Sequence, residues 1–166
     1  MNLLKRLLWV IGIFILIVVI ISLFLPSNLQ MKKSIVIDAD EDQIFNQIND
    51  LKNWKNWSAW SLKDESIFLD ENNYSKNTIG EGAIFTWMTN NEEVGEGELK
   101  ILKSNQEKIE TEINIGFSPI NSQWLFNIAN EGVEVEWITN IDFGFNPFSK
   151  FYGLFMGESM EKDYDL

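Results

Sequence analysis

The residue types that carry most enzyme chemistry are missing from this chain. Its 166 residues include no histidine and no cysteine. A Ser-His-Asp triad, a Cys-His pair, an HExxH zinc site and disulfides are therefore excluded. Acid–base chemistry would have to use carboxylates, lysine or tyrosine, and none of the 25 acidic residues stands within an apolar run where burial would raise a pKa. We assign no catalytic residue, no metal ligand and no cofactor.

Two glycine pairs resemble fragments of a phosphate-binding loop. Gly80-Glu-Gly82 and Gly95-Glu-Gly97 each lack a third glycine, and each precedes an expected strand rather than a helix. A dinucleotide-binding loop needs both features. The two pairs therefore indicate turns that open strands.

Aromatic residues are the remaining candidates for a functional site. The chain has seven tryptophans, and an indole ring in a cavity can contact an apolar ligand while its N–H is hydrogen-bonded. Trp54 and Trp57 are expected mainly to pack helices onto a sheet, and an ordinary core position is the alternative for every other aromatic residue. The candidate ligand-binding residues of a cavity wall are Trp60, Trp87, Trp124, Phe126, Trp137, Phe151 and Phe155.

The N-terminal region contains an uncharged run, Leu7 to Leu25, in which sixteen residues are Leu, Ile, Val or Phe. As a helix it would be about 28 Å long, close to the hydrocarbon thickness of a bilayer. We expect a retained single-pass anchor over 7–25. The alternative, a cleaved secretory signal, has a shorter apolar run and a small-x-small cleavage site, which 23–28 does not offer.

The distribution of charge predicts the orientation of the chain in the membrane and argues against some partners. Lys5 and Arg6 favour a cytoplasmic N-terminus over 1–6 and an extracytoplasmic domain, although Lys32 and Lys33 on the other flank make the margin small. We expect a linker over 26–32 and one domain over 33–166. After the anchor there are 11 basic and 25 acidic residues, a net charge of −14. This charge argues against a nucleic-acid partner, while the oligomeric state cannot be predicted.

The order of expected elements indicates an α+β fold. A strand over 34–38 precedes a helix with Asp40 as N-cap and Gln43 completing a capping box. A short helix or turn follows to Trp60. Strands are then expected over 83–89, 98–103, 107–115, 124–128 and 133–142, and the last segment returns to helical spacing from Phe148.

Apolar and polar residues alternate along these strands, which predicts one buried and one solvent-exposed face, as is typical of an antiparallel sheet. Trp124, Phe126 and Ile128 share a face on one strand. The side chains expected to be buried together are Ile109, Ile113, Phe126, Val135 and Trp137. The C-terminal stripe expected to dock on the sheet is Phe148, Phe151, Tyr152, Phe155, Met156 and Met160.

From Lys33 onward the sequence resembles the START-like SRPBCC superfamily, and within it the polyketide cyclase/dehydrase-type branch of membrane-anchored bacterial members. The segments that carry the resemblance are 49–61, 80–87, 94–99 and 146–156. The resemblance implies a helix-grip fold, in which an antiparallel sheet wraps around a C-terminal helix and encloses an apolar cavity for lipids, polyketides or other hydrophobic ligands. The superfamily shares no catalytic motif, so none is transferred to this chain.

One departure from the superfamily concerns the C-terminal helix. The sequence stops at 164–166 inside the helical pattern, which leaves at most about five turns. We therefore expect a truncated helix and a partly open cavity.

The function expected from these features is a membrane-tethered domain that binds a hydrophobic small molecule or lipid. A cyclase- or dehydrase-like enzyme and a ligand-free protein-interaction module are the alternatives. An internal cavity above about 300 Å³ would favour the first or second of these three functions over the interaction module.

Overall fold

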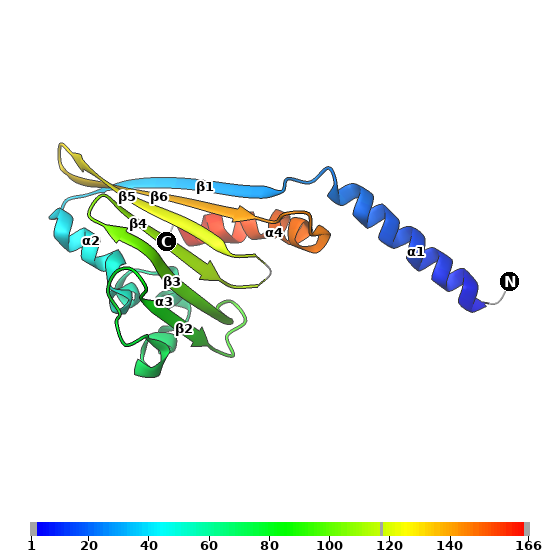
Figure 1. The fold of residues 1–166 in the computed structure, drawn as a ribbon, viewed down its shortest axis with the longest axis horizontal. Coiled ribbons are helices and arrows are strands. Elements are labelled where there is room, and N and C mark those ends of the chain that lie inside the picture. The colour runs from blue at the N-terminus through cyan, green and yellow to red at the C-terminus, as the bar shows by residue number, and fades with distance from the viewer. Residues whose placement is uncertain (1–2, 117, 165–166) are drawn as a thin grey trace.

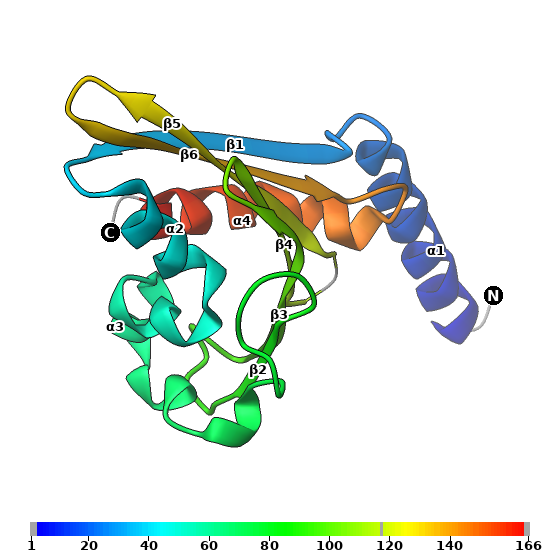
Figure 2. The same cartoon turned by 60° about the vertical axis from the view of Figure 1, so that its left-hand side comes forward.

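Six strands form one antiparallel sheet, and helices lie on its concave side (Figures 1 and 2). A computed structural model of the chain describes residues 3–116 and 118–164, except the side chains of 155, 156 and 158–164. The elements in chain order are α1 (Leu3–Ser22), β1 (Asn28–Ile37), α2 (Glu41–Asn49), η1 (Leu51–Asn56), α3 (Ala59–Lys63), η2 (Glu65–Phe68), η3 (Glu71–Asn73), β2 (Ile84–Met88), β3 (Glu96–Asn105), β4 (Lys108–Asn114), β5 (Ile120–Ala129), β6 (Gly132–Asp142) and α4 (Pro147–Tyr164).

The sheet topology confirms the expected helix-grip fold. The strand order is β1-β6-β5-β4-β3-β2, so strands 2 to 6 form a meander and the first strand pairs with the last. In Figure 2, α4 and the group from α2 to α3 lie on the same side of the curved sheet. Helix α4 and the α2–α3 group cover different parts of that side, and α4 lies along β1.

The buried face of the sheet agrees with the alternation in the sequence. Ile109, Ile113, Phe126 and Val135 are buried, and Trp137 packs partly buried against them. Ile128 was expected on the buried face with Trp124 and Phe126, but it is 86% exposed. It lies near the tip of the β5–β6 hairpin, which projects beyond the helices in Figure 1.

Helix α2 begins where the sequence predicts, but it is not capped as predicted. Asp40 occupies the N-cap position, yet its side chain makes no capping hydrogen bond. Glu41 and Asp42 in the first turn instead place negative charge near the positive end of the helix dipole. Ile44 and Ile48 turn inward and are buried, and they join this helix to the sheet.

The first strand is longer than predicted. Residues 28–32 were expected in a linker, but they pair with β6 in register from Asn28 opposite Asp142. The linker expectation is wrong for these residues, because Leu29 and Met31 continue the alternation of the strand with polar residues between them.

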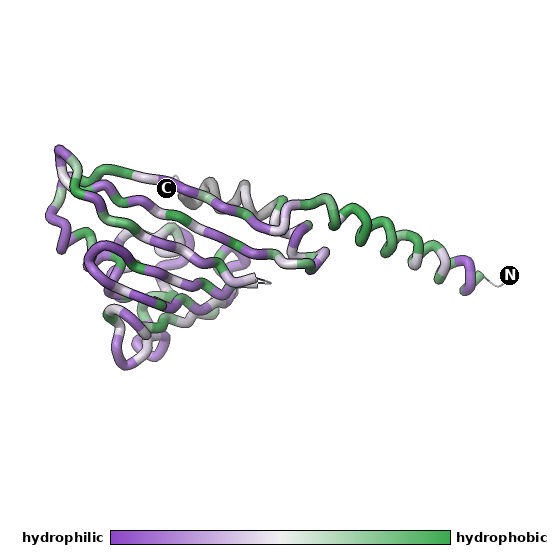
Figure 3. Tube along the Cα trace, turned by 45° about the horizontal axis from the view of Figure 1, so that its top comes forward, coloured by the Kyte–Doolittle hydropathy of each residue, from purple (hydrophilic) through white to green (hydrophobic). Residues whose placement is uncertain are grey.

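The apolar N-terminal run is one helix that stands apart from the domain. Helix α1 starts at Leu3, earlier than the expected 7, and ends at Ser22 rather than 25. It is long and apolar enough to cross a membrane, and Ser22 is its one buried residue. In Figure 3 it is a nearly continuous hydrophobic segment, whereas the strands alternate.

Candidate functional site

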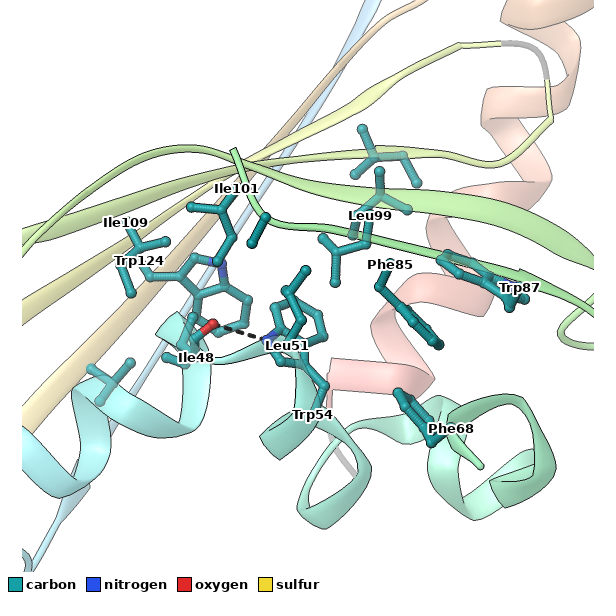
Figure 4. Packing of buried hydrophobic residues seen from close by; sticks show 14 of the residues in the cluster. Ile48, Leu51, Trp54, Phe68, Phe85, Trp87, Leu99, Ile101, Ile109 and Trp124 are labelled. Carbon is teal, nitrogen blue, oxygen red and sulfur yellow. Dashed lines mark hydrogen bonds between the residues drawn. The ribbon is translucent and has the colours of Figure 1, made fainter. Parts of the chain in front are cut away.

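Aromatic rings pack against one another between the sheet and the α2–η2 segment, and Figure 4 shows Trp54, Phe68, Phe85, Trp87 and Trp124 among them. We call this group of rings the aromatic stack. Its members are Trp54, Trp57, Trp60, Phe68, Tyr74, Phe85, Trp87, Trp124 and Trp137.

Trp54 is the centre of the aromatic stack. Its ring centroid lies 4.7 Å from that of Trp57, 6.2 Å from that of Trp60 and 6.0 Å from that of Trp124. Its indole N–H donates to the backbone carbonyl of Ile48 at 2.9 Å, the bond drawn in Figure 4. The Trp54 side chain of η1 thus contacts both α2, through its hydrogen bond to Ile48, and the sheet, through the Trp124 ring.

Four of the predicted wall residues form two pairs on different sides of Trp54. Trp60 and Trp87 lie 4.7 Å apart, and Trp124 and Trp137 lie 4.3 Å apart and nearly parallel. Phe126 contacts Phe45 edge to face at 5.6 Å. These predicted wall residues therefore contact other aromatic rings of the protein.

Several indole N–H groups of the aromatic stack donate to protein acceptors, among them those of Trp54 and Trp57. Trp87 donates to the carbonyl of Val94 at 3.4 Å, and Trp124 donates to the hydroxyl of Thr111 at 3.3 Å. Ring stacking and these hydrogen bonds give the aromatic residues a structural role. Their contact with a ligand stays a prediction.

The C-terminal helix departs from its predicted stripe. Phe151 is half-buried, Tyr152 is exposed and 74% of Phe148 is exposed. Phe148 lies on the first turn of α4, at the end of the helix nearest α1. The side chains of Phe155, Met156 and Met160 lie outside the described residues.

An open cleft lies between β1 and α4. Its volume is about 280 Å³, and it is lined by Leu29, Met31, Lys32, Lys33 and Gly157. It is a surface cleft rather than the enclosed cavity above about 300 Å³ that would favour a ligand-binding function. The sequence predicts a linker over 26–32, so Leu29, Met31 and Lys32 are not among the predicted site residues.

The concave face of β1 continues beyond this cleft and becomes more exposed. Ile35 and Ile37 pair with Val135 and Val133, which are buried on the concave face. Since directly opposite residues of a ladder share a face, both isoleucines point to that side, and 63% of Ile35 is exposed there. Lys33, opposite Trp137, lies on the same face. We call the apolar residues on either side of this lysine the apolar strip: Leu29, Met31, Ile35 and Ile37.

Three titratable groups have shifted pKa values, and none of them lines the cleft. Hydrogen bonds from the hydroxyls of Ser66 and Thr89 lower the pKa of Asp64, which also caps η2. The hydrogen bond from Lys108 lowers the pKa of Glu110. Burial, reinforced by nearby carboxylates, raises the pKa of Tyr74 to about 12. No group of acidic residues that could hold a metal occurs within the described part of the chain.

Comparison with known proteins identifies the fold. The sequence matches no family model and no curated protein. An uncharacterised protein from Rhizobium leguminosarum is similar in structure, with a TM-score of 0.54, 12% identity, and 69% of this chain and 76% of that one covered.

A protein of unknown function from Staphylococcus aureus has a TM-score of 0.54 at 11% identity, with 83% of this chain and 90% of that one covered. The di-domain ARO/CYC StfQ from the steffimycin biosynthetic pathway has a TM-score of 0.53 at 7% identity, and 83% of this chain covers 48% of it. The chain thus spans about half of that protein. At these identities the likeness establishes the helix-grip fold alone.

Proposed function

We propose that this chain is a membrane-anchored helix-grip domain of the START-like superfamily that binds a hydrophobic small molecule or lipid. The observation that carries this proposal is the apolar strip of β1, whose Leu29 and Met31 line the cleft beside α4 and whose Ile35 and Ile37 are exposed on the concave face. The concave face of a curved sheet beside a helix is a common place for an apolar ligand. The strip offers methyl and methylene groups, and Lys33 lies among them on the same face, so the proposed activity is binding.

The proposed anchor is α1. At 20 residues it would be about 30 Å long. Its side chains are exposed along nearly its whole length, which argues against a core helix. Lys5 and Arg6 at its start favour a cytoplasmic N-terminus and an extracytoplasmic domain.

One observation favours the second candidate, a protein-interaction module without a ligand. Four of the predicted wall residues pack against other rings of the aromatic stack, and Trp54 lies between Trp60 and Trp124. Such packing is what an interaction module with a filled core would have.

Photo-crosslinking distinguishes the two candidates. The full chain in lipid nanodiscs is illuminated with a diazirine-labelled fatty acid, and crosslinks are mapped by peptide mass spectrometry. We expect crosslinks in the β1 peptide, reduced several-fold by Ile35→Asp, which places a charge in the strip without burying it. Met88→Asp is the control, because Met88 is an exposed apolar residue on β2, the strand at the opposite edge of the sheet.

Crosslinking that Ile35→Asp and Met88→Asp affect equally would contradict the ligand site. Crosslinking confined to α1 would also contradict it, and the interaction-module candidate would then take its place.

A further inference from the structure

The corner between β6 and α4, residues 143–148, presents large apolar side chains to solvent. Phe145 is 95% exposed and Phe148 is 74% exposed. No charged residue occurs from Phe143 to Ser149. Leu23 and Phe24, which follow α1, are exposed as well. Two separate segments of the chain thus contribute to one uncharged region at the same end of the molecule (Figure 1).

Hydrogen bonds hold the backbone of this corner in one conformation. The Asp142 carboxylate accepts from the Gly144 N–H at 2.7 Å, and the Asn146 side-chain carbonyl accepts from the Phe148 N–H at 3.0 Å. Gly144 has a φ of 53°, a left-handed value that suits glycine. The two exposed phenylalanines, Phe145 and Phe148, are therefore positioned by a turn whose backbone is hydrogen-bonded.

A buried lysine joins this corner to the end of α1. Lys150, in the first turns of α4, donates from Nζ to the carbonyl of Ser22 at 3.2 Å and to that of Leu25 at 3.4 Å. These are carbonyls at the C-terminal end of α1, where a helix lacks backbone donors and its dipole is negative. The Phe143 N–H donates to the Ser27 carbonyl at 2.8 Å. The corner and the end of α1 therefore form one joint.

We infer that the corner is a membrane contact, in which Phe145 and Phe148 insert into the headgroup and acyl boundary of the bilayer beside α1. This inference rests on the proposed membrane span. If α1 crosses the bilayer, the joint holds the corner at the level where the span emerges. Exposed phenylalanines at that level are typical of segments that lie in the interface.

The attraction in this contact is apolar rather than electrostatic. The Lys150 ammonium is buried and bonded to the carbonyls of α1, so it does not face the headgroups. The net charge of −14 after the anchor opposes binding to anionic lipid. A bilayer of neutral lipid therefore suits this surface.

The absence of cysteine from the chain allows a direct test. Single cysteines replace Phe145, Phe148, Leu16 or Ile128 in the full chain, and each variant is labelled with a nitroxide. After reconstitution in phosphatidylcholine vesicles, the accessibility of each label to oxygen and to a water-soluble nickel complex reports its depth. Leu16 lies within α1 and Ile128 at the distant hairpin tip.

We expect the labels at 145 and 148 to have a several-fold higher ratio of oxygen to nickel accessibility than the label at 128. This ratio at 145 should fall when Phe148→Ser is added, because the second phenylalanine helps to hold the corner in the lipid. A water-like ratio at 145 and 148, together with a lipid-like ratio at 16, would overturn the corner inference and leave the anchor intact. A water-like ratio at 16 would overturn the anchor itself, and with it the inference.

Discussion

At the scale of single residues, Gly97 on β3 shows how tightly the aromatic stack is packed. A Cβ atom on Gly97 would lie 2.4 Å from Cζ2 of Trp87 and 2.5 Å from Cγ2 of Ile115. The Trp87 ring is buried and stacked on two other rings, so it has little freedom to move away. The absence of a side chain at 97 is a requirement of packing.

We predict that Gly97→Ala lowers the free energy of unfolding by about 1–3 kcal/mol through overpacking. Denaturant unfolding of the full chain in detergent measures it. Adding Trp87→Phe to Gly97→Ala should recover part of the loss, because the smaller ring leaves room for the methyl group. Equal stability of Gly97→Ala and the unaltered chain would contradict the close contact.

Tyr74 gives a pH-dependent prediction. Its ring packs on Phe85 at 4.9 Å and its hydroxyl donates to the carbonyl of Phe68 at 3.3 Å. The pKa is raised from 10.0 to about 12, so the folded chain retains the tyrosine proton over a range in which the unfolded chain loses it. Stability from this residue is complete below pH 10 and is lost as the pH rises from 10 to about 12.

The Tyr74→Phe variant should lack this loss. The difference in unfolding free energy between the unaltered chain and the variant should stay constant up to pH 10 and then fall towards pH 12. Taking the difference cancels the titration of lysines common to both. Parallel stability curves across this range would show that Tyr74 titrates normally.

At the scale of elements, the order of strands and helices followed from the sequence because each has a strong local pattern. The alternation in β4 and β6 and the helical spacing of Ile44 and Ile48 both survive in the structure. The N-terminal part of β1 was missed because it directly follows Pro26 and was assigned to the linker, although Leu29 and Met31 alternate with polar residues. Pairing with β6, a partner more than a hundred residues away, makes it a strand.

Strand β6, which lies between β1 and β5, gives the prediction for this scale. Val135 is buried opposite Phe126 on the concave face. Val135→Asp should lower the unfolding free energy by several kcal/mol, because it buries an unpaired charge. Loss of near-ultraviolet circular dichroism measures the effect, and Ile128→Asp on the neighbouring strand should leave the signal unchanged. A cooperative transition of unaltered midpoint in Val135→Asp would show that this face is not the core.

At the scale of the whole molecule, the aromatic residues of the candidate site were identified from the sequence, but their neighbours were not. Residue type predicts that a tryptophan is buried, yet the choice between a cavity wall and a stack depends on which rings meet. Trp60 contacts Trp87 because the chain through η1 and α3 brings its ring next to β2. The cleft beside Leu29 and the exposed Phe145 depend on how α4 and α1 pack, which no local pattern encodes.

Membrane attachment is the prediction that concerns the entire chain. Sixteen apolar residues in the run 7–25 favour insertion by about 6 kcal/mol, at roughly 0.4 kcal/mol each. The full chain should remain in the membrane pellet after an alkaline wash, and its mass should include residues 1–26. A variant that begins at Ser27 keeps all of β1 and the bond from the Phe143 N–H to the Ser27 carbonyl, so it should appear in the supernatant as a folded domain. Recovery of the intact full chain in the supernatant would contradict the anchor, and a membrane-free product that starts near 26 would indicate a cleaved signal instead.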